Sequence, residues 1–433
     1  MKKIGLNIIA LILTGIYILF VPVDMFAQEK SCTDCHSKLI NKKIFHAAAD
    51  DCSNCHSITV NQEHFTKKND FALNEKMPDL CYMCHEAKNT KKNVHMPAAE
   101  GECTICHAPH SSPYVNLLTK SPTSKMCYEC HDLDISGKDF LHLPVKEGKC
   151  ENCHDPHQSD NNKFLQSEKP QLCFNCHEKQ KNETNLDYVH PPFDDDCSNC
   201  HNSHKSQYKN LLTEKTPTLC FNCHEGQDLI QNSKSVHGVI KDKKSCSNCH
   251  SPHASKYNKF LYEENNRLCF SCHNRTIKTE KVKIENISLK IKDAKSVHPP
   301  IEIDGCTACH NPHYSENNYL LNLKYPDKRY TEAIPENFAL CFECHDSGLL
   351  TEQNTTSATN FRNGNKNMHF LHIKGKKGRS CSLCHDIHAS GNLHLIKEKS
   401  EFGNWEMDMN YKTFNNGGSC FPGCHGEKSY IRE

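Results

Sequence analysis

Tryptophan, glycine and apolar residues are all scarce in this chain of 433 residues. It holds one Trp, 18 Gly and only 36% hydrophobic residues, and its mean hydropathy is −0.72. A chain this poor in apolar side chains cannot build a core of ordinary size from its own residues. Net charge is absent too, because 52 Lys and Arg balance 52 Asp and Glu. The polypeptide therefore offers no electrostatic reason to bind nucleic acid or an anionic membrane surface.

No cysteine lies outside one recurring motif, although the chain has 30 of them. Fourteen motifs read C-x-x-C-H and the last reads C-x-x-x-C-H. The cysteine pairs are Cys32 and Cys35, Cys52 and Cys55, Cys81 and Cys84, Cys103 and Cys106, Cys127 and Cys130, Cys150 and Cys153, Cys173 and Cys176, Cys197 and Cys200, Cys220 and Cys223, Cys246 and Cys249, Cys269 and Cys272, Cys306 and Cys309, Cys341 and Cys344, Cys381 and Cys384, and Cys420 and Cys424. The histidines that follow them are His36, His56, His85, His107, His131, His154, His177, His201, His224, His250, His273, His310, His345, His385 and His425.

This spacing fits covalent attachment of haem c, because two thiols bond to one porphyrin while the adjacent imidazole binds its iron. A single C-x-x-C could instead belong to a zinc site or a redox pair, but neither needs a histidine directly after the second cysteine. We therefore predict fifteen haem c groups, with iron as the metal. The stretched motif at Cys420 is the weakest, since Pro422 and Gly423 lengthen its loop, and a failed or disulfide-bonded site remains an alternative there.

Sixteen further histidines are available as second axial ligands for fifteen irons. Seven lie six to nine residues before a motif: His46, His95, His142, His190, His237, His298 and His372. Six follow a motif histidine by three residues, as C-H-x-x-H, and His64 is a looser equivalent: His110, His157, His204, His253, His313 and His388. His369 and His394 fit neither pattern, so one of these two or His64 is spare. We expect two histidines on every iron.

Histidines three residues apart cannot bind opposite faces of one porphyrin, because they share one side of the backbone. His110 must therefore serve a different haem from His107, and the same holds in every C-H-x-x-H copy. This exchange of ligands predicts that neighbouring haems lie close together. Two imidazoles on each iron also predict low reduction potentials and no open iron face.

The motifs group into seven two-haem repeats, with Cys32 and Cys35 as an extra N-terminal site. About 29 residues per motif suffice for loops and short helices but not for a sheet or bundle. The predicted fold is mostly irregular with short α-helices around a haem core. Apolar pairs such as Leu117-Leu118 recur seven and eight residues after the C-H-x-x-H histidine, which favours a short helical turn against haem.

The stretch 276–297 interrupts the repeats between the eleventh and twelfth motifs. Val282, Ile284, Ile287, Leu289 and Ile291 alternate with polar residues, which predicts an inserted β-hairpin that serves as a spacer or a docking edge. We accordingly divide the chain into 28–275 with eleven haems, the insert 276–297, and 298–433 with four haems. The Thr- and Asn-rich stretch 349–367 predicts an exposed loop.

Residues 1–27 are typical of a secretory signal peptide, with Lys2 and Lys3 before an apolar run from Ile4 to Val21. The run is also long enough to stay uncleaved as a membrane anchor. Both interpretations require export.

The doubled motifs, such as Cys103 to His110 followed by Cys127 to His131, resemble the doubled-motif family of multihaem cytochromes c. The resemblance covers residues 32 to 425 and implies an electron conduit in the periplasm or at the exterior of a Gram-negative cell, in anaerobic or extracellular respiration. An inner-membrane quinol oxidase or a small cytochrome would be the donor, and an outer-membrane or extracellular protein the acceptor. The stretched last motif and the enlarged last two repeats depart from the pattern, which leaves the ligands of the C-terminal haems in doubt.

Two alternatives remain open. A multihaem enzyme would need an open iron, often marked by C-x-x-C-K, and this chain contains no such motif. We therefore expect no catalysis. A subunit of an extracellular cytochrome filament would have the same motifs as a soluble conduit.

Overall fold

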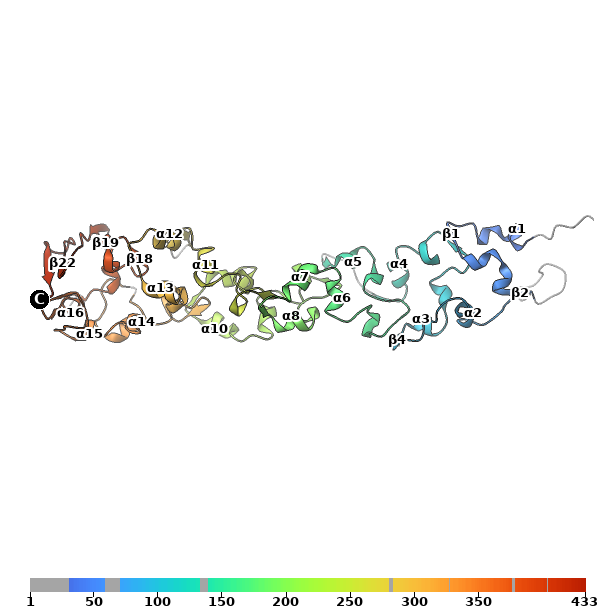
Figure 1. The fold of residues 1–433 in the computed structure, drawn as a ribbon, viewed down its shortest axis with the longest axis horizontal. Coiled ribbons are helices and arrows are strands. Elements are labelled where there is room, and N and C mark those ends of the chain that lie inside the picture. Colours follow the sequence, from blue (N-terminus) through green and yellow to red (C-terminus); the bar gives the residue numbers. More distant parts are fainter. Residues whose placement is uncertain are drawn as a thin grey trace, which may run out of the picture. The chain divides into compact units, whose positions relative to one another are not determined.

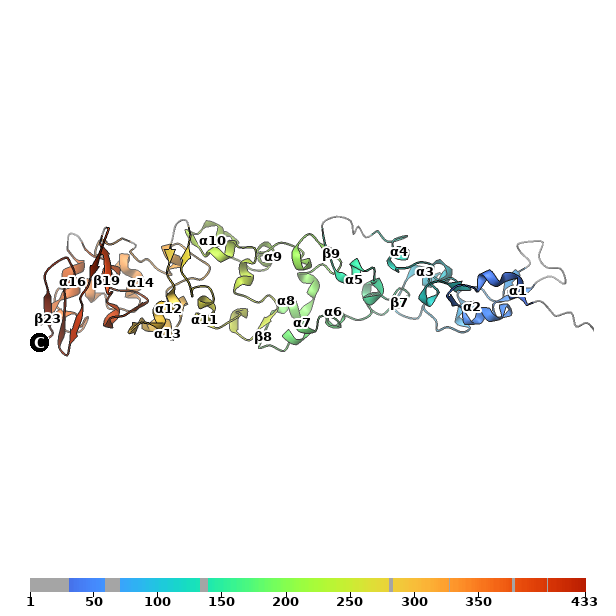
Figure 2. The ribbon, with the colours of Figure 1, turned by 90° about the horizontal axis from the view of Figure 1, so that it is seen from above.

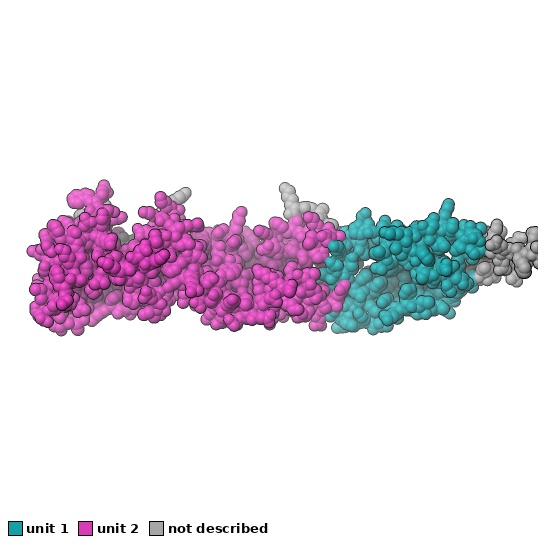
Figure 3. All heavy atoms as spheres, turned by 45° about the horizontal axis from the view of Figure 1, so that its top comes forward, with its two compact units in different colours: residues 1–133, 148–164 teal, residues 134–147, 165–433 magenta. Residues whose placement is uncertain are grey.

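A computed structural model describes residues 31–58, 71–132, 139–279, 283–326, 328–375, 378–402 and 404–433. The chain forms two compact units, made of the described parts of 1–133 with 148–164 and of 134–147 with 165–433 (Figure 3). We describe each unit by itself. The predicted signal segment and His64 lie outside the described residues. In the described part of the chain, no helix is both long and apolar enough to cross a membrane.

Short helices joined by loops make up both units (Figures 1 and 2). The described α-helices have four to six residues each: α1 (Cys32–His36), α2 (Asp79–Tyr82), α3 (Met96–Ala99), α4 (Ser124–Cys127), α5 (Leu143–Lys146), α6 (Gln171–Phe174), α7 (Glu178–Glu183), α8 (Pro191–Asp195), α9 (Thr218–Phe221), α10 (Gln227–Asn232), α11 (Asn265–Phe270), α12 (Ile287–Lys292), α13 (Pro299–Ile303), α14 (Ala339–Phe342), α15 (Gly348–Thr351) and α16 (Met368–Ile373). The predicted fold class, mostly irregular with short helices, is confirmed.

Successive repeats are joined by six antiparallel pairs of two-residue strands. In each pair, the strand before an upstream histidine bonds to the strand after the C-H-x-x-H histidine of the next repeat. The pairs are β1 (Ile44–Phe45) with β5 (Ser111–Ser112), β4 (Asn93–Val94) with β7 (Gln158–Ser159), β6 (Phe140–Leu141) with β9 (Lys205–Ser206), β8 (Tyr188–Val189) with β11 (Ala254–Ser255), β10 (Ser235–Val236) with β15 (Tyr314–Ser315), and β14 (Ser296–Val297) with β18 (Ala389–Ser390). We call each pair a clasp. Strands of two residues are not stable alone, so the clasps depend on the predicted haem core for their stability.

The recurring apolar pairs lie in single short turns, and these turns are left-handed, a handedness that the predicted short helical turn did not specify. In the first of them, Asn116 and Leu117 both have φ of 55°, and the N–H of Leu118 donates to the carbonyl of Val115 over 3.3 Å. Two consecutive residues with positive φ define a type I′ turn. The same left-handed pair recurs at Lys163-Phe164, Asn210-Leu211, Lys259-Phe260, Tyr319-Leu320 and His394-Leu395.

The backbone strain in these turns gives a testable prediction at Asn116, whose side chain is exposed. Positive φ costs a β-branched residue about 1–2 kcal/mol more than glycine. We expect Asn116→Val to lower the free energy of unfolding by about that amount, and Asn116→Gly to preserve or raise it. Denaturant unfolding monitored by haem absorbance checks this. Equal stabilities of the two variants would contradict a backbone origin.

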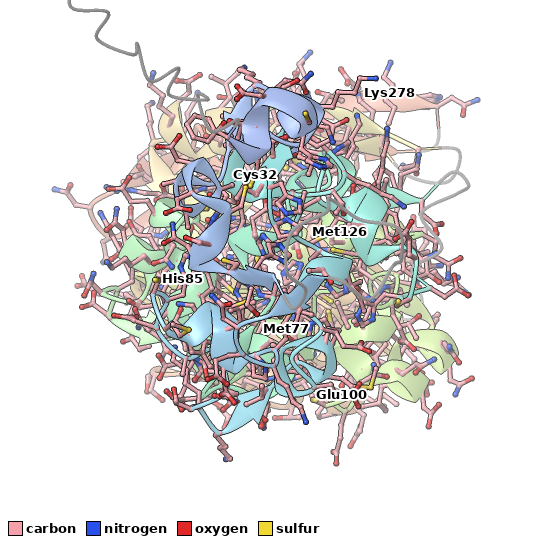
Figure 4. All side chains as sticks on the ribbon, turned by 90° about the vertical axis from the view of Figure 1, so that its right-hand side faces the viewer. Cys32, Met77, His85, Glu100, Met126 and Lys278 are labelled. Carbon is pink, nitrogen blue, oxygen red and sulfur yellow. The ribbon has the colours of Figure 1, made fainter. Side chains whose placement is uncertain are left out.

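The insert between the eleventh and twelfth motifs combines a small hairpin with a helix. Strands β12 (Ile277–Lys278) and β13 (Lys283–Ile284) pair, and Lys278 projects outward (Figure 4). The predicted strand character of residues 287–291 is wrong, because these residues form α12. Asn286 caps this helix by accepting the N–H of Leu289 at 2.9 Å. Ile287 and Ile291 are four apart, a spacing that also fits one helix face, so alternation alone could not distinguish the two structures.

The C-terminal part of the second unit contains the longest strands of the described chain. Strands β19 (Lys399–Phe402) and β20 (Trp405–Asp408) form one hairpin, and β21 (Lys412–Phe414), β22 (Gly417–Cys420) and β23 (Lys428–Ile431) form a three-stranded sheet. Phe338 and Leu350, each 1% exposed, are the most buried large apolar side chains. The stretch 349–367 is not loop throughout, because β16 (Arg362–Asn363) and β17 (Lys366–Asn367) pair within it.

Candidate haem sites

Fourteen of the fifteen motifs place their first cysteine in one short helical turn. In the first motif of a repeat it lies in a 3-10 turn, as at Cys103–Ile105, and in the second motif of the first six repeats it lies in a short α-helix, as in α6. The N–H of the motif histidine donates to the carbonyl of the first cysteine over 3.0 Å from His107 to Cys103 and from His177 to Cys173. The stretched last motif differs, because Cys420 ends strand β22 and the N–H of His425 donates to the carbonyl of Pro422 over 3.2 Å. All thirty cysteines are free of disulfides.

The structure places thirteen motif histidines opposite thirteen of the further histidines, with ring centroids 5.8–6.5 Å apart. Seven pairs join an upstream histidine to the second motif of its own repeat: His46–His85, His95–His131, His142–His177, His190–His224, His237–His273, His298–His345 and His372–His425. Five join a first motif to the C-H-x-x-H histidine of the next repeat: His56–His110, His107–His157, His201–His253, His250–His313 and His310–His388. The last is His385–His369.

The separation of these rings fits an iron between them. Metal–imidazole bonds are about 2.0–2.1 Å long, so two trans imidazoles on one ion place their centroids about 6.3 Å apart. Direct contact between the rings would bring them closer than the observed range. Two imidazoles alone do not make a metal site, and the described residues contain no group of three or more His, Cys, Asp or Glu gathered around one point. The remaining ligands must come from a macrocycle, which the two neighbouring thiols of each motif would hold.

The sequence left open which of His369, His394 and His64 is the spare histidine, and the structure pairs His369 with a motif histidine. His369 lies opposite His385 in the first motif of the last repeat, although His369 is not part of a C-H-x-x-H motif. His372 lies three residues later on the same helix, α16, and faces His425. His394 faces no motif histidine among the described residues. Its ring lies against Tyr411 with centroids 6.4 Å apart, and its backbone forms one of the left-handed turns.

The thirteen pairs do not include every predicted ligand. His64 lies outside the described residues. His154 belongs to the first unit and His204 to the second, and the two units are described separately.

The clasps hold the histidines of adjacent pairs at fixed spacing. The N–H of six of the seven upstream histidines donates to the carbonyl of a C-H-x-x-H histidine over 2.8–3.0 Å, from His46 to His110, His95 to His157, His142 to His204, His190 to His253, His237 to His313 and His298 to His388. The Nδ1–H of the upstream ring donates to the carbonyl of the residue that precedes the C-H-x-x-H histidine. His95, for example, donates to Pro156, the residue before His157, over 2.9 Å. Because Nδ1 donates there, Nε2 carries the free lone pair that a metal needs.

The left-handed turns orient the motif histidines in the same way. The carbonyl of the first turn residue accepts the Nδ1–H of the first-motif histidine, from His107 to Asn116, His154 to Lys163, His201 to Asn210, His250 to Lys259, His310 to Tyr319 and His385 to His394, over 2.7–3.0 Å. Sequence reasoning missed these turn residues because only their backbone acts and their side chains vary. The available signal was their constant offset of nine residues from the motif histidine.

Burial favours the neutral form of several paired histidines. At His369, burial and then the neighbouring His385, His372 and His345 lower the pKa to about 3. Burial likewise lowers the pKa of His310 and of its counterpart His388. Neutral imidazole is the form that binds a metal, so these side chains are ready to coordinate at neutral pH.

Thiols of successive sites lie in contact at the junctions between repeats. The thiols of Cys173 and Cys197 hydrogen-bond, which raises the pKa of Cys173 and lowers that of Cys197 to about 7. The equivalent contacts join Cys32 to Cys52, Cys81 to Cys103, Cys127 to Cys150, Cys220 to Cys246, Cys269 to Cys306 and Cys341 to Cys381. Within each unit, successive attachment points are therefore side by side, as the exchange of histidines predicts.

Comparison with known proteins identifies the repeat. The model of the doubled CXXCH motif matches at residues 46–90, 95–135, 142–182, 190–229, 237–278 and 298–349, together more than half of the chain. Each match begins at an upstream histidine and ends beyond the second motif that this histidine faces.

The chain is also 29% identical over 163 residues to the multiheme cytochrome MtrA of Shewanella baltica (strain OS185). The alignment covers 36% of this chain and 48% of that protein, so it spans about half the length of this relative. The repeated matches, the cysteine pairs and the facing histidines agree with one another. The chain belongs to the doubled CXXCH motif family of multihaem c-type cytochromes.

Proposed function

We propose that this protein is an electron-transfer conduit that carries fifteen haem c groups, each between two histidines. The observation that carries the proposal is the set of thirteen histidine pairs whose centroids are 5.8–6.5 Å apart. Bound haem supplies reversible one-electron exchange at its iron. The chain positions the attachment thiols, fixes the tautomer of the imidazoles whose Nδ1 donates to a carbonyl, and sets the spacing between successive pairs.

Contact between successive sites supports transfer along the chain. Thiols of neighbouring motifs hydrogen-bond at the repeat junctions, and the clasps join neighbouring histidine pairs through one backbone hydrogen bond. Porphyrins attached at these thiols would have adjacent edges. Close and regular spacing is what a relay of electrons needs, whereas a storage or sensing protein has no need of an unbroken series.

Two histidines on each iron leave no coordination position for a substrate, so we propose that the protein is not an enzyme. Imidazole on both faces also gives lower potentials than methionine ligation would. Low potentials suit anaerobic or extracellular respiration in the cell envelope. We propose a periplasmic or exterior location, with a quinol oxidase or small cytochrome as donor and an outer-membrane or extracellular acceptor.

Intact mass and spectroscopy of the exported protein test this proposal together. We expect a mass increase equal to fifteen haems and an oxidised spectrum that is entirely low-spin. Replacing Cys420 and Cys424 by serine should remove one haem, because both attachment thiols of the stretched motif are lost. Fewer haems in the parent would contradict the proposed set of fifteen. A high-spin signal that shifts on addition of nitrite or hydroxylamine would overturn the proposed function in favour of an enzyme with an open iron.

A further inference from the structure

We propose that Glu183 is a positioning residue that lowers the reduction potential of the haem between His201 and His253. This inference rests on the proposed function and adds a specific role at one site. Oε2 of Glu183 lies 3.1 Å from Nδ1 of His253 and accepts a hydrogen bond from its N–H. Both side chains are mostly buried, with 20% and 27% of their surfaces exposed.

No equivalent carboxylate contact is described at the corresponding histidines His110, His313 and His388. At His157 the nearest carboxylate oxygen, Oδ1 of Asp155, is 3.6 Å away, beyond hydrogen-bond distance. Glu183 comes from the last position of α7, in the linker between two repeats, and lies 70 residues before His253. The sequence of the motif therefore gives no sign of this contact.

The ring of His253 also has an aromatic neighbour. Phe193, which is 7% exposed, stacks on it with centroids 4.6 Å apart and an interplanar angle of 24°. The other repeats have small or aliphatic residues three positions after their upstream histidine, such as Ala98, Val145 and Ile240. The His201–His253 pair is inclined by 48°, whereas the other four pairs of its type are inclined by 11–29°. Phe193 and Glu183 together thus fix both the plane and the tautomer of this ligand.

A carboxylate on Nδ1 makes an imidazole a stronger donor, because its negative charge favours partial loss of the Nδ1 proton. A stronger donor stabilises the ferric more than the ferrous state and so lowers the reduction potential. His201, on the other side, donates to the carbonyl of Asn210 at 2.8 Å, as at the other first motifs. The additional lowering therefore comes from His253. The motif of His201, which would attach this haem, is the eighth of fifteen, so the effect would place a step of low potential midway along the series.

Comparison of Glu183→Gln with the parent protein tests the inference. The amide keeps the size and can still accept a hydrogen bond, but it removes the charge. We expect one haem of the set to move to higher potential by about a tenfold change in its reduction equilibrium, or about 59 mV for one electron. The ferric low-spin resonance of one haem should change with it. Glu183→Asp, which keeps the charge but withdraws the carboxylate, should give a smaller shift.

The matched control is Glu178→Gln, which removes an equal charge from the exposed first turn of the same helix. It should leave the potential and the resonance of this haem as in the parent. A redox titration of Glu183→Gln that superimposes on the parent would overturn the inference, and so would an equal shift in Glu178→Gln. The proposed function is judged separately, because it fails only if the parent itself lacks its full set of low-spin haems.

Discussion

Produced without attached haem, this chain will be unfolded. We expect a circular dichroism spectrum without ordered structure, no cooperative thermal transition and rapid digestion by protease, whereas the holoprotein resists the same treatment. The reason is the small amount of apolar surface that the polypeptide buries by itself. Only twelve hydrophobic residues of the described chain are buried, and four of these are alanine or methionine.

Conformational entropy leads to the same expectation. Ordering a residue costs about 1–2 kcal/mol of conformational entropy, and two-residue strands and one-turn helices contribute little against it. The bound macrocycles must therefore supply most of the buried surface, as structural metals do in small domains.

The measurement needs one gene expressed with and without the haem-attachment machinery, and purified in both cases under reducing conditions so that free thiols do not form disulfides. Reduced holoprotein is the matched control, because it differs only in the attached groups. A cooperative unfolding transition in the haem-free chain would show that the polypeptide has a sufficient core of its own.

Spacing within the sequence predicted the local chemistry of the sites. Two cysteines and a histidine in one turn can reach one porphyrin whatever surrounds them, so the motif residues follow from local geometry. His107 and His110, which are three positions apart, likewise required different partners, and they face His157 and His56 respectively. Short-range constraints of this kind are visible in a single sequence.

The partners themselves could not be predicted, because the clasps that select them join strands more than fifty residues apart. His201 and His253 meet through the pairing of β8 with β11, and the sequences Tyr188-Val189 and Ala254-Ser255 carry no signal for each other. The left-handed conformation of the recurring turns could not be predicted from the sequence either. Asparagine is the one frequent turn residue that tolerates positive φ, whereas Lys163 and Tyr319 give no such indication.

His369 and His394 both lie outside the repeat patterns of the sequence, but an experiment can distinguish their roles. Replacing His369 with alanine should convert one haem of the set from low-spin to high-spin, because this ring faces His385 at 6.3 Å and is the only described histidine placed to complete that site. Its Nδ1 bonds to Oγ1 of Thr359 at 3.0 Å, and Phe361 packs against its ring, so the side chain is held in one orientation. Absorbance near the high-spin charge-transfer band and electron paramagnetic resonance measure the change.

His394→Ala is the matched control, because it removes the same ring from an exposed turn whose backbone carbonyl still accepts the Nδ1–H of His385. This variant should keep every haem low-spin. Added imidazole should restore the low-spin spectrum of His369→Ala by binding the vacated iron face, which would separate the loss of a ligand from general unfolding. If His369→Ala stays wholly low-spin, or if His394→Ala produces the high-spin signal, the assignment of His369 to the site of His385 is wrong.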